Sequence, residues 1–131
     1  MNDIQSNQAG SFITGVIMDP ISGIATYKDS TFAMLLEAQR RGHDILYMEP
    51  GDLTMRDGAA YGHMRPLEVR DDPNDWFTLG DSSNRPLSGL DFLLMRKDPP
   101  FDMDYVYTTY VLDLAERDGV TVVNRPQSLR D

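Results

Sequence analysis

Short apolar runs, separated by longer segments of mixed character, dominate the hydrophobic pattern of the chain. They are FITGVIM at 12–18, DILYM at 44–48, LDFLLM at 90–95 and VTVV at 120–123. The first run is β-branched and apolar without clear alternation, which is typical of a strand covered on both faces of a sheet. The pattern predicts four strands, at least two of them buried in the interior of an α/β domain.

A helical pattern lies between the first two runs. Apolar side chains recur at helical spacing through residues 31–41, and Asp29 or Ser30 can cap the first amides. Arg40 and Arg41 place positive charge at the C-terminal end of the predicted helix, where it interacts favourably with the helix dipole, and Gly42 is placed to end the helix. Strand, helix and strand in this order predict a parallel βαβ unit with a right-handed crossover.

A second helix is predicted over residues 102–118, closed by Gly119. We expect one of its faces to be formed by Tyr107, Tyr110 or Val111, and Leu114.

The middle of the chain has a different character. Asp57 and Gly58 stand between two short strand-like runs in residues 53–61, which is a strong local signal for a hairpin. Prolines and glycines break the remainder into short pieces. We therefore predict an irregular loop at 71–88, with Trp76 and Phe77 packed against the body of the domain.

Composition narrows the function classes. The chain has 131 residues, enough for one domain, and 21 acidic against 12 basic residues give a formal charge of −9. This acidity disfavours nucleic acid as a partner. There is no cysteine, and His43 and His63 do not stand at metal-ligand spacing. No apolar run is long enough to span a bilayer and no secretory signal is visible, so we expect a cytoplasmic protein that does not contact a membrane.

The candidate chemistry lies where the predicted strands end. In an open parallel sheet, ligands bind beyond the carboxyl ends of the strands. Three such loops carry unusual residues: Asp19-Pro20-Ile21, residues 96–102 (RKDPPFD) and residues 124–126 (NRP). Arg96 and Lys97, held before two prolines, suit a small anionic ligand. The alternative is structural, with Arg96 paired to Asp19 or Asp98.

No glycine-rich phosphate loop follows the first strand, where the sequence reads DPISGIATYKDS. A stand-alone dinucleotide-binding or P-loop enzyme is therefore disfavoured.

Several long motifs carry a resemblance. The segments MDP, KDSTFAMLLEAQRRGH, MRKDPPFD and VNRPQSLRD, and their spacing from Ile13 to Asp131, closely resemble the N-terminal region of bacterial glutathione synthetase. The resemblance implies a pre-ATP-grasp domain, which is a Rossmann-like, open and mainly parallel sheet flanked by helices, with a β-hairpin excursion. Residues 1–11 are polar apart from one isolated Ile, and we expect a disordered tail there. The resemblance implies that the α/β domain follows at 12–124 and that a linker starts at 125–131.

The activity implied by the resemblance is that of an ATP-grasp ligase, glutathione synthase, which joins γ-glutamylcysteine to glycine through an acyl phosphate. ATP and Mg²⁺ are then bound mainly by an ATP-grasp domain that follows this region, so no cofactor is expected here and this chain alone is expected to be inactive. A homo-oligomer is expected for the complete enzyme. The implied substrate-binding residues, with no catalytic or metal-binding residue among them, are Met18, Asp19, Pro20, Ile21, Arg96, Lys97, Asp98 and Pro99. The alternative is a non-catalytic Rossmann-like binding or subunit-docking module.

Overall fold

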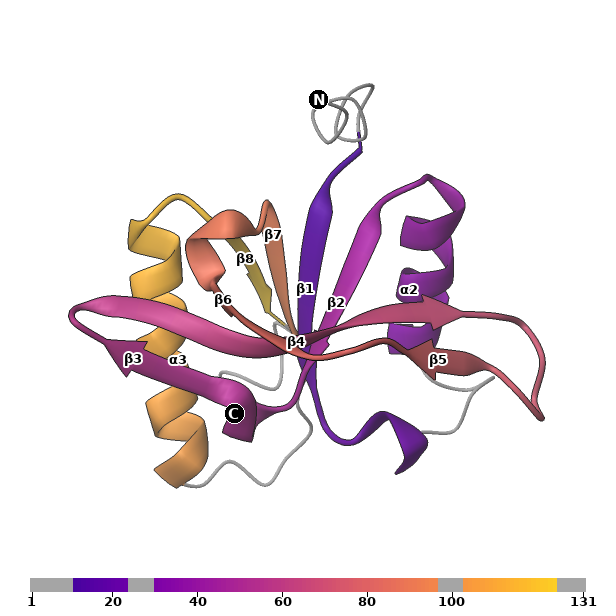
Figure 1. Ribbon diagram of the computed structural model, residues 1–131, viewed down its shortest axis with the longest axis horizontal. Coiled ribbons are helices and arrows are strands. Elements are labelled where there is room, and N and C mark those ends of the chain that lie inside the picture. The colour runs from indigo at the N-terminus through magenta and orange to yellow at the C-terminus, as the bar shows by residue number, and fades with distance from the viewer. Residues whose placement is uncertain (1–10, 24–29, 97–102, 125–131) are drawn as a thin grey trace.

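The structure, a computed structural model, describes residues 11–23, 30–96 and 103–124. The described chain forms an α/β domain around one eight-stranded mixed sheet (Figure 1). Its strands are β1 (Ile13–Met18), β2 (Asp44–Met48), β3 (Leu53–Arg56), β4 (Ala59–Val69), β5 (Phe77–Leu79), β6 (Ser83–Pro86), β7 (Phe92–Arg96) and β8 (Thr121–Asn124). Its helices are α2 (Ser30–Arg40) and α3 (Met103–Arg117), with short 3-10 turns at Ile21–Gly23, Pro50–Asp52 and Leu87–Gly89.

The four predicted strands form the parallel half of the sheet, in the order β2-β1-β7-β8. Ile13 of β1 is in register with Asp44 of β2, Thr14 of β1 with Phe92 of β7, and Phe92 in turn with Thr121 of β8. The predicted parallel β1-α2-β2 unit and the α/β class are therefore confirmed. All four strands point the same way, so their carboxyl ends lie at one edge of the sheet.

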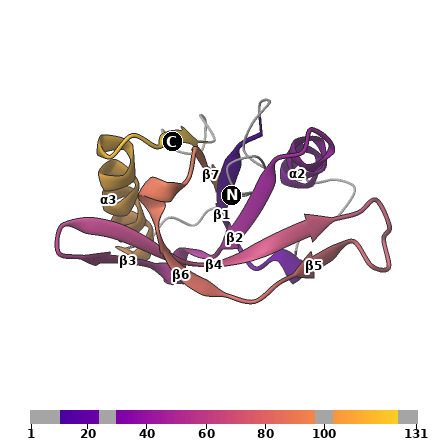
Figure 2. The same ribbon diagram turned by 45° about the horizontal axis from the view of Figure 1, so that its top comes forward.

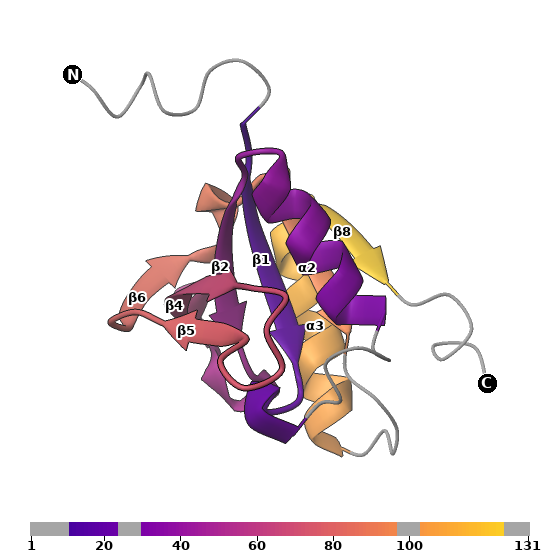
Figure 3. The ribbon, with the colours of Figure 1, turned by 90° about the vertical axis from the view of Figure 1, so that its right-hand side faces the viewer.

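The two helices cover opposite faces of these strands (Figures 1 and 3). Val16 of β1 packs in the apolar cluster that contains Leu35 of α2, whereas its neighbour Ile17 packs in the cluster that contains Val111 of α3. Because successive strand side chains point to opposite faces, a strand that is buried on both sides has a continuous apolar run. This explains the pattern of the first strand.

Both helices end at a glycine in the left-handed region, as predicted: φ is +86° at Gly42 and +103° at Gly119. The predicted capping of α2 by Asp29 or Ser30 remains a prediction, because Asp29 and the side chain of Ser30 lie outside the described structure.

The face predicted for α3 matches only in part the face that packs on the sheet. Tyr107 and Tyr110 are 39% and 61% exposed, and Leu114 is only partly buried. The buried face consists of Thr108, Val111, Leu112 and Ala115, which follow the i, i+3, i+4, i+7 spacing of a helix. Apolar residues surround more than half of this helix, so periodicity alone allowed two faces, and packing on the sheet selected the one centred on Val111.

The predicted hairpin is confirmed. β3 and β4 are antiparallel, with Leu53 opposite Gly62 and Arg56 opposite Ala59. Asp57 and Gly58 between them have φ of +54° and +79°. Two consecutive residues with positive φ form the turn whose twist matches that of the flanking strands, and this is why Asp-Gly is favoured there.

The prediction of an irregular loop at 71–88 is wrong in part. Residues 77–79 and 83–86 form β5 and β6, and both pair with the long strand β4, which runs across the parallel strands (Figure 2). β6 has the sequence SNRP and is exposed at every position, so it has no apolar pattern that sequence could reveal. Its order comes from backbone pairing with β4. Trp76 is buried as predicted, with its ring centroid 5.1 Å from that of Phe32.

No helix in the described ranges is long and apolar enough to cross a membrane.

Candidate functional site

The predicted site residues at the ends of β1 and β7 are neighbours in the structure. Met18 and Arg96 are register partners, so β1 and β7 end side by side at the same edge of the sheet. The side chains of Met18 and Ile21 are buried in the apolar cluster under α2, whereas Asp19 is half-buried and Pro20 is exposed. A ligand at this edge could reach the backbone of residues 18–21 and the side chain of Asp19. Lys97, Asp98 and Pro99 lie outside the described residues. So do residues 125–126, which belong to the predicted loop after β8.

Arg96, at the end of β7, lies at this edge. Its Nε–H donates to the hydroxyl of Thr31, 3.1 Å away and buried in the first turn of α2. This bond joins the end of β7 to the start of the helix that crosses from β1 to β2. Sequence reasoning missed the role of Thr31, although the motif KDST contained it. A threonine at a helix start more often signals a cap than a partner for a distant arginine.

Tyr47 holds the loop after β1 in place. The backbone N–H of Ile21 donates to the phenolic oxygen of Tyr47, at 3.0 Å in a buried position, and the Tyr47 hydroxyl donates in turn to a carboxylate oxygen of Glu49. Burial, and then the hydrogen bond to Glu49, raise the pKa of Tyr47 well above its usual range, so the phenol stays protonated and can donate. Sequence reasoning missed this pair. Its signal was a tyrosine in the buried strand DILYM with Glu49 two residues on, because a buried phenol needs a partner.

A cleft of about 460 Å³ adjoins Tyr47 at the carboxyl end of β2. Its lining residues are Tyr47, Glu49, Asp52, His63, Arg65, Asp81 and Ser82. The backbone N–H of Glu49 donates to Asp52 Oδ2 at 2.8 Å, which fixes the turn that follows the strand. The cleft combines acidic and basic side chains at the carboxyl edge of the parallel strands.

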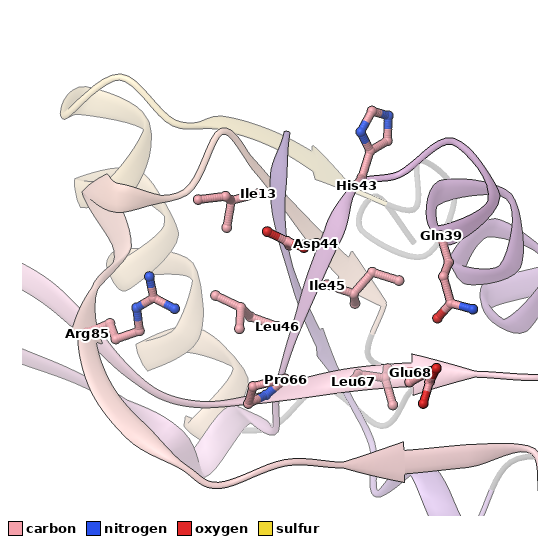
Figure 4. Close-up of a pocket in the computed structure, with 10 residues that line it drawn as sticks. All are labelled: Ile13, Gln39, His43, Asp44, Ile45, Leu46, Pro66, Leu67, Glu68 and Arg85. Carbon is pink, nitrogen blue, oxygen red and sulfur yellow. The ribbon is translucent and has the colours of Figure 1, made fainter. Parts of the chain in front are cut away.

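A second cavity, of about 530 Å³, lies at the other end of the parallel strands (Figure 4). It opens between β2 and β4 and is bordered by Ile13 and Asp44, which start β1 and β2. Gln39 closes one side, since its amide donates to the Val69 carbonyl at 2.7 Å and accepts from the Val69 N–H at 2.8 Å. His43 Nδ1 accepts the N–H of Phe12 at 3.1 Å. These bonds give Gln39 and His43 structural roles at the amino ends of the parallel strands.

Metal ligands do not gather in the described part of the chain. No group of three or more histidine, aspartate or glutamate side chains there is placed to hold a metal ion.

The four parallel strands and the helices on both of their faces define a Rossmann-like α/β domain. Residues 13–130 match the family described as prokaryotic glutathione synthetase, N-terminal domain, and the chain belongs to this family.

Curated relatives named glutathione synthetase extend the match. The relative from Coxiella burnetii is 58% identical over 117 residues, which cover 89% of this chain and 36% of the relative. Those from Shewanella oneidensis and Escherichia coli strain K12 are 57% and 53% identical over 117 residues, again 89% of this chain and 37% of each relative. The chain thus spans little more than a third of the length of the relatives that it matches.

Proposed function

We propose that this chain forms the substrate-side domain of an ATP-grasp ligase, glutathione synthase, that joins γ-glutamylcysteine to glycine through an acyl phosphate. The observation that carries the proposal is that Met18 and Arg96 are register partners at the carboxyl edge of the parallel strands. Relatives at 53–58% identity, which are named glutathione synthetase, indicate the ligand class. Residues Met18 to Ile21 and Arg96 to Pro99 form the substrate side of the site.

Arg96 is the residue that we assign to a substrate carboxylate. A guanidinium can bind a carboxylate through two parallel hydrogen bonds, and one whose Nε is already held by Thr31 loses less conformational freedom on binding. The rigid edge of the sheet then orients the peptide, and orientation is a large part of catalysis when the protein itself does little covalent chemistry.

ATP and Mg²⁺ do not fit the residues described here. Carboxylates are not grouped for a metal ion within the described ranges, and the first βα loop lacks the glycines of a phosphate-binding turn. We therefore assign nucleotide, metal and the phosphoryl step to an ATP-grasp domain of the complete protein, and propose that this domain alone is inactive. A cytoplasmic location for the complete enzyme is part of this proposal.

The test is Arg96→Ala in the full-length protein, with Arg85→Ala as the matched control, since Arg85 is an exposed arginine of β6. We expect Arg96→Ala to raise the KM for γ-glutamylcysteine by about tenfold or more, while the protein remains folded at the assay temperature. Loss of folding, with activity falling only in proportion to the folded fraction, would support a structural ion pair instead.

A docking role has its own supporting observation. Val106, Tyr107 and Tyr110 are 39–61% exposed along the outer side of α3. Large apolar side chains that share one helix face and remain exposed are typical of an interface. We propose that this face contributes to a homo-oligomer of the complete enzyme. Light scattering tests it: Tyr110→Lys should lower the apparent mass, and an unchanged mass would exclude this face from the interface.

A further inference from the structure

The cleft at the end of β2 brings together charged groups from three parts of the chain. Glu49 and Asp52 come from the turn that follows β2, His63 and Arg65 from β4, and Asp81 and Ser82 from the connection between β5 and β6. Arg65 is the register partner of Tyr47, so it lies directly beside the end of β2. The cleft is separate from Arg96, which is on the far side of β1.

Hydrogen-bonding capacity remains free in this cleft. Glu49 Oε2 accepts the Tyr47 hydroxyl, Asp52 Oδ2 accepts the Glu49 N–H, and the Glu49 side chain also takes part in a capping box with the backbone of Asp52. Arg65 uses its Nε for the carbonyl of Gly80, at 3.0 Å, which anchors the guanidinium and leaves its terminal nitrogens available. Within the described ranges, no hydrogen bond or ion pair engages the side chain of Asp81. The cleft therefore offers acceptors and donors that are already positioned.

The arrangement selects a class of ligand. The carboxylates are not grouped for a metal ion in the described part of the chain, so a point cation is not the natural occupant. Acceptors from Glu49, Asp52 and Asp81 suit an ammonium group, and the guanidinium of Arg65 among them suits a carboxylate. A volume of about 460 Å³ lies in the range of small-molecule sites. A molecule that carries an ammonium and a carboxylate on one carbon matches both features.

We propose that this cleft binds the head group of an α-amino acid, with its ammonium at Glu49 and Asp81 and its carboxylate at Arg65. The inference rests on the proposed function for the identity of the ligand, which is then the γ-glutamyl end of γ-glutamylcysteine. The ends of β2 and β7 are two strand spacings apart, about 10 Å. An extended γ-glutamyl dipeptide with a hydrogen bond at each end covers a comparable distance. Its other carboxylate then lies toward Arg96. Tyr47, which borders the cleft, accepts the N–H of Ile21, in the segment that follows the intervening strand β1.

The experiment compares ligands that differ by one charged group. γ-Glutamylcysteine is compared with glutarylcysteine, which lacks the α-ammonium, in binding and turnover by the full-length protein. The variants are the double replacement Glu49→Gln with Asp81→Asn, which keeps shape and acceptors but removes two charges, and Asp71→Asn as control. Asp71 is an exposed aspartate of the β4–β5 connection that does not line the cleft.

We expect the parent and Asp71→Asn to bind glutarylcysteine about tenfold more weakly than γ-glutamylcysteine, because an ammonium bound by carboxylates contributes charge-assisted hydrogen bonds. In the double variant the two ligands should bind within about threefold of each other. A tenfold preference that survives in the double variant overturns the assignment.

A second pair of probes separates this inference from the proposed function. L-Glutamate and glutarate carry the same distinction without the cysteine, and their binding needs no ligase activity. If the protein catalyses ligation and the double variant still prefers L-glutamate to glutarate as strongly as the parent does, the ammonium site in the cleft is refuted and the proposed function is retained. If the parent does not catalyse ligation but prefers L-glutamate to glutarate, and the double variant loses this preference, the proposed function is refuted and the ammonium site in the cleft is retained.

Discussion

Replacing Tyr47 by phenylalanine removes one oxygen atom from the contact between the end of β2 and the loop that follows β1. That oxygen accepts the buried N–H of Ile21 at 3.0 Å and donates its proton to Glu49. The ring stays, so the apolar packing of a side chain that is 4% exposed is conserved. The substitution therefore tests the hydrogen bonds alone.

The expected cost follows from the group that is left behind. A buried N–H without an acceptor costs about 1–3 kcal/mol of stability. Tyr47 also borders the cleft, so water can partly solvate the exposed N–H, and we expect the lower half of this range, about 1–2 kcal/mol. For a chain of 131 residues the entropy of unfolding converts this into a fall in Tm of about 4–7 °C.

The assay is thermal and urea unfolding followed by circular dichroism, with Tyr61→Phe as the matched control. Tyr61 contacts Arg56 through the face of its ring, with the guanidinium carbon 4.9 Å from the centroid, and this contact survives the control substitution. The control should unfold within about 0.5 kcal/mol of the parent. If Tyr47→Phe is as stable as Tyr61→Phe, the Ile21–Tyr47–Glu49 chain of bonds does not hold the loop, and the reasoning fails.

The same variant also tests how stability depends on pH. The pKa of Tyr47 is raised above its ordinary value of 10.0 in the folded state, first by burial and then by Glu49. The stabilisation is therefore fully present below pH 10 and is lost as the pH rises above it, because only the unfolded chain releases this proton readily. The parent should lose stability above pH 10 more steeply than Tyr47→Phe, and parallel alkaline profiles would contradict the assignment.

Three further predictions concern the fold. Gly15→Ala should cost about 1–3 kcal/mol in urea unfolding, because the added Cβ meets Leu90 Cδ1 at 2.6 Å and Met48 Cε at 2.9 Å; Gly51→Ala, which meets nothing within 4 Å, should be neutral. Gly58→Ala should cost about 1 kcal/mol, since φ is +79° there. Glu37 should titrate near pH 2 by NMR because Arg40 and then Arg41 donate to it, and Arg40→Gln should move its pKa back toward 4.5.

Each of these has a contradicting result. Equal stability of the variants at Gly15 and Gly51 would show that the core around β1 has room for a methyl group. An unchanged stability for Gly58→Ala would mean that the turn relaxes without cost. A normal pKa for Glu37 would show that its contacts with the two arginines do not persist. Because the side chain of Glu37 is 45% exposed, the shift of its pKa should also decrease as salt is added.

Sequence alone determined the elements that rest on local rules. The apolar runs, the helical spacing of 31–41, the glycines after both helices and the Asp57-Gly58 turn each predict one conformation whatever their surroundings. Parallel strands follow from the order of strand, helix and strand. The neighbourhood of Met18 and Arg96 was predictable in outline for the same reason, since parallel strands share a carboxyl edge.

Tertiary structure alone decided which distant groups meet. β6 is exposed and polar, and it is a strand only because β4 supplies its hydrogen-bond partners. The buried face of α3 was chosen among several apolar stripes by the sheet beneath it. The bonds from Thr31 to Arg96 and from Ile21 to Tyr47 join residues 65 and 26 positions apart, and no periodicity encodes such a pairing. Local patterns determine conformation, whereas contacts between remote residues depend on the packing of the whole chain.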